Sequence, residues 1–111
     1  MEIWKNKMLE HINKKRLSYQ LHPLELDNHL CNIAHQHVLS MNHKNKIYNT
    51  SFTHQQVLST CLQDLESNII FFIHIWIQLD PSILLNPKFQ KIGFYYFTNH
   101  YSHTYITYYC E

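Results

Sequence analysis

The stretch from Met8 to Met41, MLEHINKKRLSYQLHPLELDNHLCNIAHQHVLSM, decides the fold, because it predicts two amphipathic helices joined by a short turn. The first helix carries one apolar stripe at helical spacing. The stripe is formed by Trp4, Met8, Leu9 and Ile12. Pro23 ends any helix before it, because the residue preceding a proline is pushed out of the α region. Asp27 is well suited to cap the second helix, since its side chain can accept from free backbone N–H groups.

The second predicted helix has an apolar face at positions i, i+3, i+4, i+8 and i+11. These positions hold Leu30, Ile33, Ala34, Val38 and Met41. His37, at i+7, shares this face. We therefore predict that the face packs into the protein core.

The composition limits the classes of function. A chain of 111 residues predicts one domain, spanning 1–111. Nine basic and eight acidic residues leave almost no net charge, so no bulk field favours nucleic acid. A single glycine disfavours glycine-rich phosphate loops. Five of the nine cations lie in the segment from Lys5 to Arg16, and we expect them on a solvated helix face. Glu10 lies four residues before Lys14, the spacing of a surface ion pair on a helix.

The three cysteines form an odd set without the C-x-x-C spacing of metal sites. Cys31 and Cys61 fall on apolar helix faces and are predicted to be buried thiols. Cys110, beside the terminus, is the one most able to pair with another chain. The segment Met1–Lys7 lacks the apolar region of a signal peptide, so we predict none and assign no compartment.

The middle of the chain is predicted to be helical. Thr53 and Gln56 form a capping-box pattern. A third helix would continue through Val57, Leu58, Cys61, Leu62 and Leu65. The apolar run Ile69–Leu79 is too short to span a bilayer and predicts a helix buried on most sides, with His74 as a core histidine. Asp80-Pro81 ends that helix.

The C-terminal segment predicts a β-hairpin. Lys91–Phe97 and Thr104–Tyr109 are rich in aromatic and β-branched residues, and Thr98–His103 supplies the turn. Gly93 marks a close approach to a neighbouring element or a bulge. His100 and His103 could bind zinc weakly, but a structural zinc site needs four ligands.

Motifs along the whole chain resemble the CAP superfamily (cysteine-rich secretory, antigen-5 and pathogenesis-related class 1 proteins), especially its short bacterial-type members. The matching positions of the first stretch are Asn13 and Arg16, Pro23-Leu24, Leu26-Asp27, and Leu30, Ala34, His37 and Met41. Trp76 matches the tryptophan of the family's last long helix. The segments Ile83–Phe89 and Ile92-Gly93 match the second half of the motif S-x-x-H-R-x-N-I/L-L-x-P-x-F-x-x-I-G.

The resemblance implies an α+β fold, a trimmed α-β-α sandwich with three to four helices around a small antiparallel sheet. We expect Leu30, Ala34 and Trp76 to share one interior. It also implies a central cavity that can hold a divalent metal. Phe52-Thr53-His54 provides the cavity histidine, and Glu66-Ser67-Asn68-Ile69 is the nearest match to the family's G-E-N-I element. Asp80 stands where the second cavity histidine would fall.

Three functions follow from these patterns. The resemblance favours a non-enzymatic module that binds a lipid, peptide or protein without a cofactor, its cavity ligands largely lost. The alternative is a zinc site formed by His54, Asp80 and Glu66 with hydrolase-like activity, since a hydrolytic metal needs three protein ligands and an open position. The third is a metal buffer of unrelated fold that uses His35, His37, His43, His100 and His103. His35 and His37 lie two residues apart on a helix and point apart, which weakens the third hypothesis.

Overall fold

The computed structural model describes residues 3–50, 54–60 and 65–111, and it describes their side chains except at positions 60 and 65–68. Within these residues the chain forms four helices and four strands. In chain order they are α1 (Ile3–Ser18), β1 (Glu25–Leu26), α2 (Asn28–Lys44), β2 (Gln55–Thr60), α3 (Leu65–Leu79), α4 (Pro81–Leu84), β3 (Lys91–Thr98) and β4 (Thr104–Cys110).

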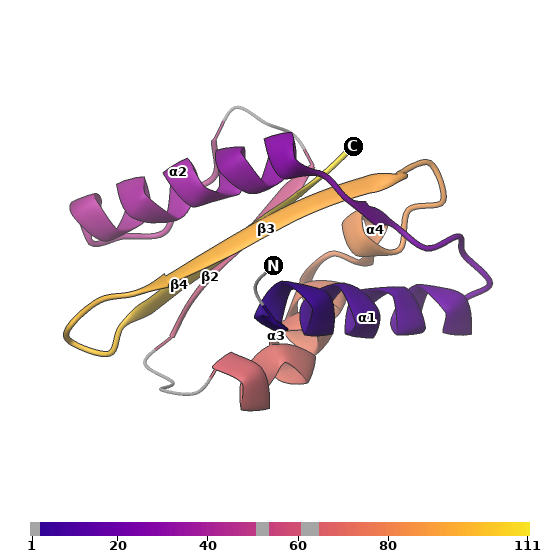
Figure 1. The fold of residues 1–111 in the computed structure, drawn as a ribbon, viewed down its shortest axis with the longest axis horizontal. Helices are drawn as coiled ribbons and strands as arrows, with labels where there is room; N and C mark the ends of the chain where they lie inside the picture. The colour runs from indigo at the N-terminus through magenta and orange to yellow at the C-terminus, as the bar shows by residue number, and fades with distance from the viewer. Residues whose placement is uncertain (1–2, 51–53, 61–64) are drawn as a thin grey trace.

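The four strands form one sheet in the order β1-β3-β4-β2. The predicted C-terminal hairpin is confirmed, with β3 and β4 paired antiparallel from Ile92↔Cys110 to Thr98↔Thr104. β2 pairs antiparallel with β4, and the two-residue β1 pairs parallel with β3, so the sheet is mixed rather than purely antiparallel. Figure 1 shows α2 on one face of the sheet and α1, α3 and α4 on the other, which confirms the predicted α-β-α sandwich.

The predicted helix after Thr53 is wrong, because Gln55–Thr60 forms strand β2. The capping box of Thr53 and Gln56 is wrong as well, because Gln56 lies in the strand and no helix begins there. Thr53, Cys61 and Leu62 lie outside the described residues, so the burial of Cys61 stays a prediction. Long-range contacts stabilise the strand: its register runs from Gln55↔Tyr109 to Thr60↔Thr104 along β4. α3 adds further contacts, since the Gln56 side chain donates to the Trp76 carbonyl at 2.9 Å.

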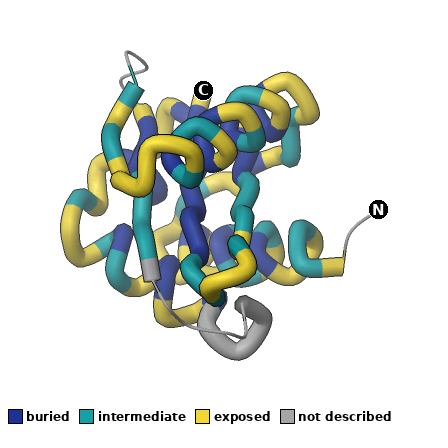
Figure 2. The backbone as a smooth tube through the Cα atoms, turned by 90° about the vertical axis from the view of Figure 1, so that its left-hand side faces the viewer, coloured by how far each residue is buried: buried dark blue, intermediate teal, exposed yellow. Residues whose placement is uncertain are grey.

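The sheet separates two cores, and successive residues of β4 face opposite layers because side chains alternate along a strand. Tyr108 packs against Trp76 on the α3 side, with ring centroids 4.8 Å apart. Tyr109 packs against Leu30 and Ala34 on the α2 side. The expectation that Leu30, Ala34 and Trp76 share one interior is therefore wrong. A three-layer sandwich has an apolar cluster on each face of its sheet, and Figure 2 shows the buried backbone running between the layers.

α2 lies close against the sheet at Gly93, as the sequence predicted. A Cβ atom at Gly93 would come within 2.2 Å of the Leu30 carbonyl carbon and the Cys31 nitrogen. The helix begins where expected, since the Asp27 carboxylate accepts from the His29 N–H at 2.8 Å. Glycine is required here because any side chain would displace α2 from the strand.

Arg16 corrects the prediction that the cations of α1 lie on a solvated face, because its side chain is fully buried. It donates to the carbonyls of His22 at 2.8 Å, Leu84 at 2.6 Å and Asn86 at 3.1 Å. These bonds join the end of α1 to the segment between α4 and β3. Burial lowers the pKa of Arg16, because the charged form is poorly solvated there.

Cys110 also differs from its prediction, because its side chain is buried and cannot reach another chain. Burial raises the pKa of this thiol to about 12, against the smaller opposing effect of Arg16. Cys31 is buried, as predicted.

α3 is buried on one face only. Ile69, Phe72, Ile73 and Trp76 face the core, whereas Ile70, Phe71 and Leu79 are exposed. His74 is exposed too, so its prediction as a core histidine is wrong. None of the helices in the described ranges has the length and apolar character that crossing a membrane requires.

Candidate functional site

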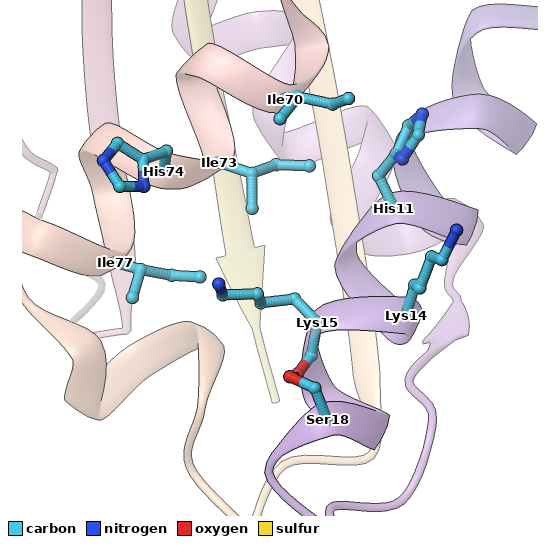
Figure 3. A pocket seen from close by; sticks show the side chains of 8 residues that line it. All are labelled: His11, Lys14, Lys15, Ser18, Ile70, Ile73, His74 and Ile77. Carbon is cyan, nitrogen blue, oxygen red and sulfur yellow. The ribbon is translucent and has the colours of Figure 1, made fainter.

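A groove of about 400 Å³ runs between α1 and α3, in the helical layer that covers one face of the sheet. Both helices contribute four side chains each, so neither helix forms the groove alone. The lining consists of His11, Lys14, Lys15 and Ser18 from α1 and of Ile70, Ile73, His74 and Ile77 from α3. Figure 3 shows Lys15 extending across the groove toward Ile77.

The two walls of the groove differ in chemistry. The α1 wall is polar and cationic, with two lysines and a histidine, whereas three of the four α3 residues are isoleucines. The expected ion pair between Glu10 and Lys14 does not form, and no carboxylate of the described residues pairs with Lys14. Lys15 lies 5.9 Å from the Tyr19 ring centroid, a contact that leaves its charge unneutralised. The groove therefore suits a ligand that combines negative charge with an apolar body.

A second polar cluster lies on the other face of the sheet, around the buried imidazole of His37. Its Nε2 is 2.7 Å from the Tyr48 carbonyl, which can only accept, so Nε2 carries the proton. Nδ1 then accepts from the Tyr109 hydroxyl at 2.6 Å. The Thr50 hydroxyl lies 3.2 Å from that of Tyr109, and the Gln55 amide donates to the Thr50 hydroxyl at 2.9 Å. This chain of hydrogen bonds holds the segment after α2 against the sheet.

The cluster borders a shallow surface pocket, but its groups are engaged with one another. Burial lowers the pKa of His37, and the hydrogen bond from its ring to the Tyr48 carbonyl opposes this only in part. Burial likewise raises the pKa of Tyr109. Both side chains are thus neutral at pH 7, and the cluster stabilises the fold rather than presenting a charge to a ligand.

The structure places the three predicted metal ligands on separate elements. His54 is exposed next to β2, and its ring lies against Phe89 with centroids 4.7 Å apart. The Asp80 carboxylate caps α4 by accepting from the Ser82 N–H at 3.0 Å. Glu66 lies in the first turn of α3, and its side chain is outside the described residues. Among the side chains that are described, no three His, Cys, Asp or Glu residues form a group able to hold a metal.

The other histidines contact different partners. His35 stacks on Tyr95 with centroids 4.1 Å apart, whereas His37 contacts Tyr48 and Tyr109, so the two point apart as expected. The His103 ring hydrogen-bonds the Ser59 hydroxyl, and His100 lies against Tyr101.

The layers and the groove define the class: a small three-layer α-β-α sandwich whose outer helices leave a cation-lined groove. The family model described as the cysteine-rich secretory protein family, CAP, matches residues 9–111. The chain therefore belongs to the CAP family, as its motifs indicated.

Solved structures share this fold. An outer surface protein from Borrelia burgdorferi superposes with a TM-score of 0.73 at 15% identity, covering 97% of this chain and 92% of its own. The crystal structure of MpPR-1i superposes with a TM-score of 0.68 at 20% identity, covering 96% of this chain and 85% of its own. A cysteine-rich secretory protein from Staphylococcus aureus superposes with a TM-score of 0.58 at 17% identity, covering 96% of this chain and 38% of its own. A comparison with curated proteins finds no match.

The groove was not predicted, because its two walls are 59 residues apart in sequence at Lys14 and Ile73. The one available signal was the cluster of cations in the first helix, which by itself is typical of a solvated surface. Only the packing of α3 beside α1 gives those lysines an apolar surface to face.

Proposed function

We propose that this CAP domain is a non-enzymatic binding module whose groove between α1 and α3 takes an anionic amphiphile, such as a long-chain fatty acid. The observation that supports this most strongly is the contrast between the walls: Lys15 extends across the groove toward the isoleucines of α3, and Lys14 lines the same groove from α1. Its volume of about 400 Å³ lies in the range of small-molecule sites.

The proposed ligand places each of its parts against matching chemistry. The carboxylate lies beside the ammonium group of Lys15, where a charge-assisted hydrogen bond is shorter and stronger than a neutral one, and Lys14 adds positive charge at the rim. The alkyl chain covers the isoleucines of α3 and removes apolar area from water. Neither wall needs a metal or a nucleophile for this, which agrees with a binding role rather than catalysis.

A fluorescent fatty acid tests the proposal. Binding of cis-parinaric acid, and its displacement by palmitate, would be measured for the parent chain and for Lys15→Glu and Ile77→Trp. Lys15→Glu reverses the charge at the carboxylate, and Ile77→Trp fills the groove. We expect Lys15→Glu to weaken binding by on the order of tenfold or more, since a hydrogen bond to a charged group contributes about 1.5–3 kcal/mol. Ile77→Trp should weaken binding as well, because the indole occupies the space of the alkyl chain.

Matched controls come from the opposite side of the molecule. Lys46 and Ile47 are exposed beyond the end of α2, so Lys46→Glu and Ile47→Trp repeat the same substitutions away from the groove. Both controls should bind as the parent does, and hexadecanol, which lacks the carboxylate, should compete poorly. Equal binding by the groove variants and the parent would overturn the proposal, provided circular dichroism shows all chains folded. The proposal would also be overturned if the groove bound a peptide or protein and not the fatty acid.

Zinc binding by His54, Asp80 and Glu66 stays the alternative prediction. The capping role of Asp80 limits its availability, because its Oδ1 already accepts from the Ser82 N–H and hydroxyl and only Oδ2 is left to ligate a metal. Calorimetric titration with zinc, comparing the parent with His54→Ala, tests it directly. Saturable binding abolished by that substitution would favour the metal site, and no heat in either chain would remove it.

A further inference from the structure

We infer that the outward surface of the α1–α3 layer docks on an anionic lipid bilayer. This goes beyond the groove and its ligand, since the surface extends past the groove on both sides and shares only Lys14 and Ile70 with the groove lining. We call this surface the basal face and define it by Ile3, Lys7, Lys14 and Leu17 of α1 and Ile70 and Phe71 of α3.

The α1 part of the basal face is one continuous helical stripe. Ile3, Lys7, Glu10, Lys14 and Leu17 fall at i, i+4, i+7, i+11 and i+14, so they lie on one side of the helix. That side is opposite the buried Met8 and Ile12. Ile3 is 67% exposed and Leu17 is 70% exposed, near the two ends of the stripe.

The second part of the basal face comes from α3, which packs beside α1. Ile70 is 64% exposed at the groove, and the Phe71 side chain is 49% exposed beside it. Six of the nine exposed large hydrophobic side chains in the described residues lie on α1, on α3 or directly after α1. They are Ile3, Leu17, Tyr19, Ile70, Phe71 and Leu79. Apolar exposure is therefore concentrated on one layer of the sandwich.

The charge on the same side determines the partner. On the α1 stripe, whose side chains are all described, Lys7 and Lys14 stand with one acidic residue, Glu10, and Lys15 lies at the groove beside it. Lysines interleaved with exposed apolar side chains are the pattern of surfaces that lie in the interface of anionic membranes. A second copy of the chain fits poorly, because a two-fold contact would place the same cations opposite one another.

Vesicle sedimentation tests the inference. The parent chain would be mixed with vesicles of phosphatidylcholine alone, or of phosphatidylcholine with phosphatidylglycerol, at low and high salt. We expect binding to the anionic vesicles only, weakened by salt because the attraction is screened. Lys14→Gln should lower the partition coefficient by about fivefold, the effect of one lysine near an anionic surface.

Two further variants separate this inference from the proposed function. Leu17→Ser/Phe71→Ser removes apolar contacts outside the groove lining and should lower vesicle binding by on the order of tenfold. It should leave displacement of cis-parinaric acid unchanged. Ile77→Trp should have the opposite effect: it should lose fatty-acid binding but sediment with anionic vesicles as the parent does. Either proposal can therefore fail alone.

The control is Ile47→Ser/Tyr101→Ser, which removes two exposed apolar side chains distant from the basal face in sequence. It should sediment with anionic vesicles as the parent does. Equal sedimentation with phosphatidylcholine alone would overturn the inference, as would a loss in this control as large as in Leu17→Ser/Phe71→Ser. A dimer in light scattering that Leu17→Ser/Phe71→Ser dissociates would overturn it as well, because the basal face would then be covered by a second copy.

Discussion

Replacing Arg16 by methionine is expected to destabilise the fold by roughly 4 kcal/mol, because the guanidinium joins three segments of the chain. Its Nε donates to the His22 carbonyl at 2.8 Å, and its Nη1 donates to the carbonyls of Leu84 and Asn86 at 2.6 and 3.1 Å. Methionine preserves much of the side-chain length and apolar packing but donates nothing. The three carbonyls would then lose their charged donor.

The magnitude follows from the number and burial of these bonds. A hydrogen bond from a charged group contributes about 1.5–3 kcal/mol, so three such bonds give roughly 4.5 kcal/mol or more. The cost of burying the guanidinium, which also lowers its pKa, offsets part of that sum. A loss of about 4 kcal/mol is a large fraction of the 5–15 kcal/mol that holds a typical domain folded.

Equilibrium unfolding in urea, followed by the fluorescence of Trp4 and Trp76, measures the change. Arg16→Lys keeps the charge but has fewer donors, so its loss in free energy of unfolding should be about half that of Arg16→Met. Lys15→Met, at the neighbouring exposed position, is the control and should change stability by no more than about 0.5 kcal/mol. A loss below about 1 kcal/mol in Arg16→Met would refute the argument that this residue joins α1 to the segment before β3.

Three further predictions concern α2, the His37 cluster and the buried thiol. Gly93→Ala should lower the free energy of unfolding by about 3 kcal/mol, because the new Cβ would lie 2.2 Å from α2 backbone atoms, and an unchanged melting temperature would contradict this. Burial lowers the pKa of His37, so the stability that the neutral imidazole contributes is present above the ordinary histidine value of about 6.5 and is lost as pH falls toward the folded-state value. Urea unfolding across pH should show this decline in the free energy of unfolding, and the decline should be smaller in His37→Gln. Cys110, whose pKa is about 12, should resist iodoacetamide at pH 8 until the chain unfolds, as site-resolved mass spectrometry would show; rapid modification of the folded chain would mean that the thiol is accessible.

The parts of the fold that depend on local sequence were predictable. The cap at Asp27, the helix end before Pro23 and the aromatic strands of the hairpin all follow from residue types and their spacing. Gly93 could be recognised as a close approach because a lone glycine in a strand has few other uses.

Strand β2 could not be predicted, because its stabilising contacts are distant in sequence. Val57, Leu58 and Leu65 have helical spacing, and no alternation marks the segment as a strand. Its partner β4 lies about fifty residues further along the chain, at Gln56↔Tyr108 for example. Tertiary pairing of this kind overrides local propensity.

The candidate sites show the same limit. His37 was correctly placed on the buried face of its helix, but its partners Tyr48 and Tyr109 come from other elements. Neither wall of the groove indicates a site by itself, because exposed lysines and apolar helix residues are common. Their juxtaposition depends on how α3 packs beside α1, which no short motif specifies.

The most direct measurement for the central claim, that the groove binds an anionic amphiphile, is NMR mapping of palmitate on the labelled chain. The claim predicts saturable shifts at His11, Lys15, Ile70 and Ile77, with Tyr48 and Tyr109 unmoved on the other face of the sheet. Saturable shifts confined to Tyr48 and Tyr109, or no shifts at the groove when palmitate is in excess, would contradict it.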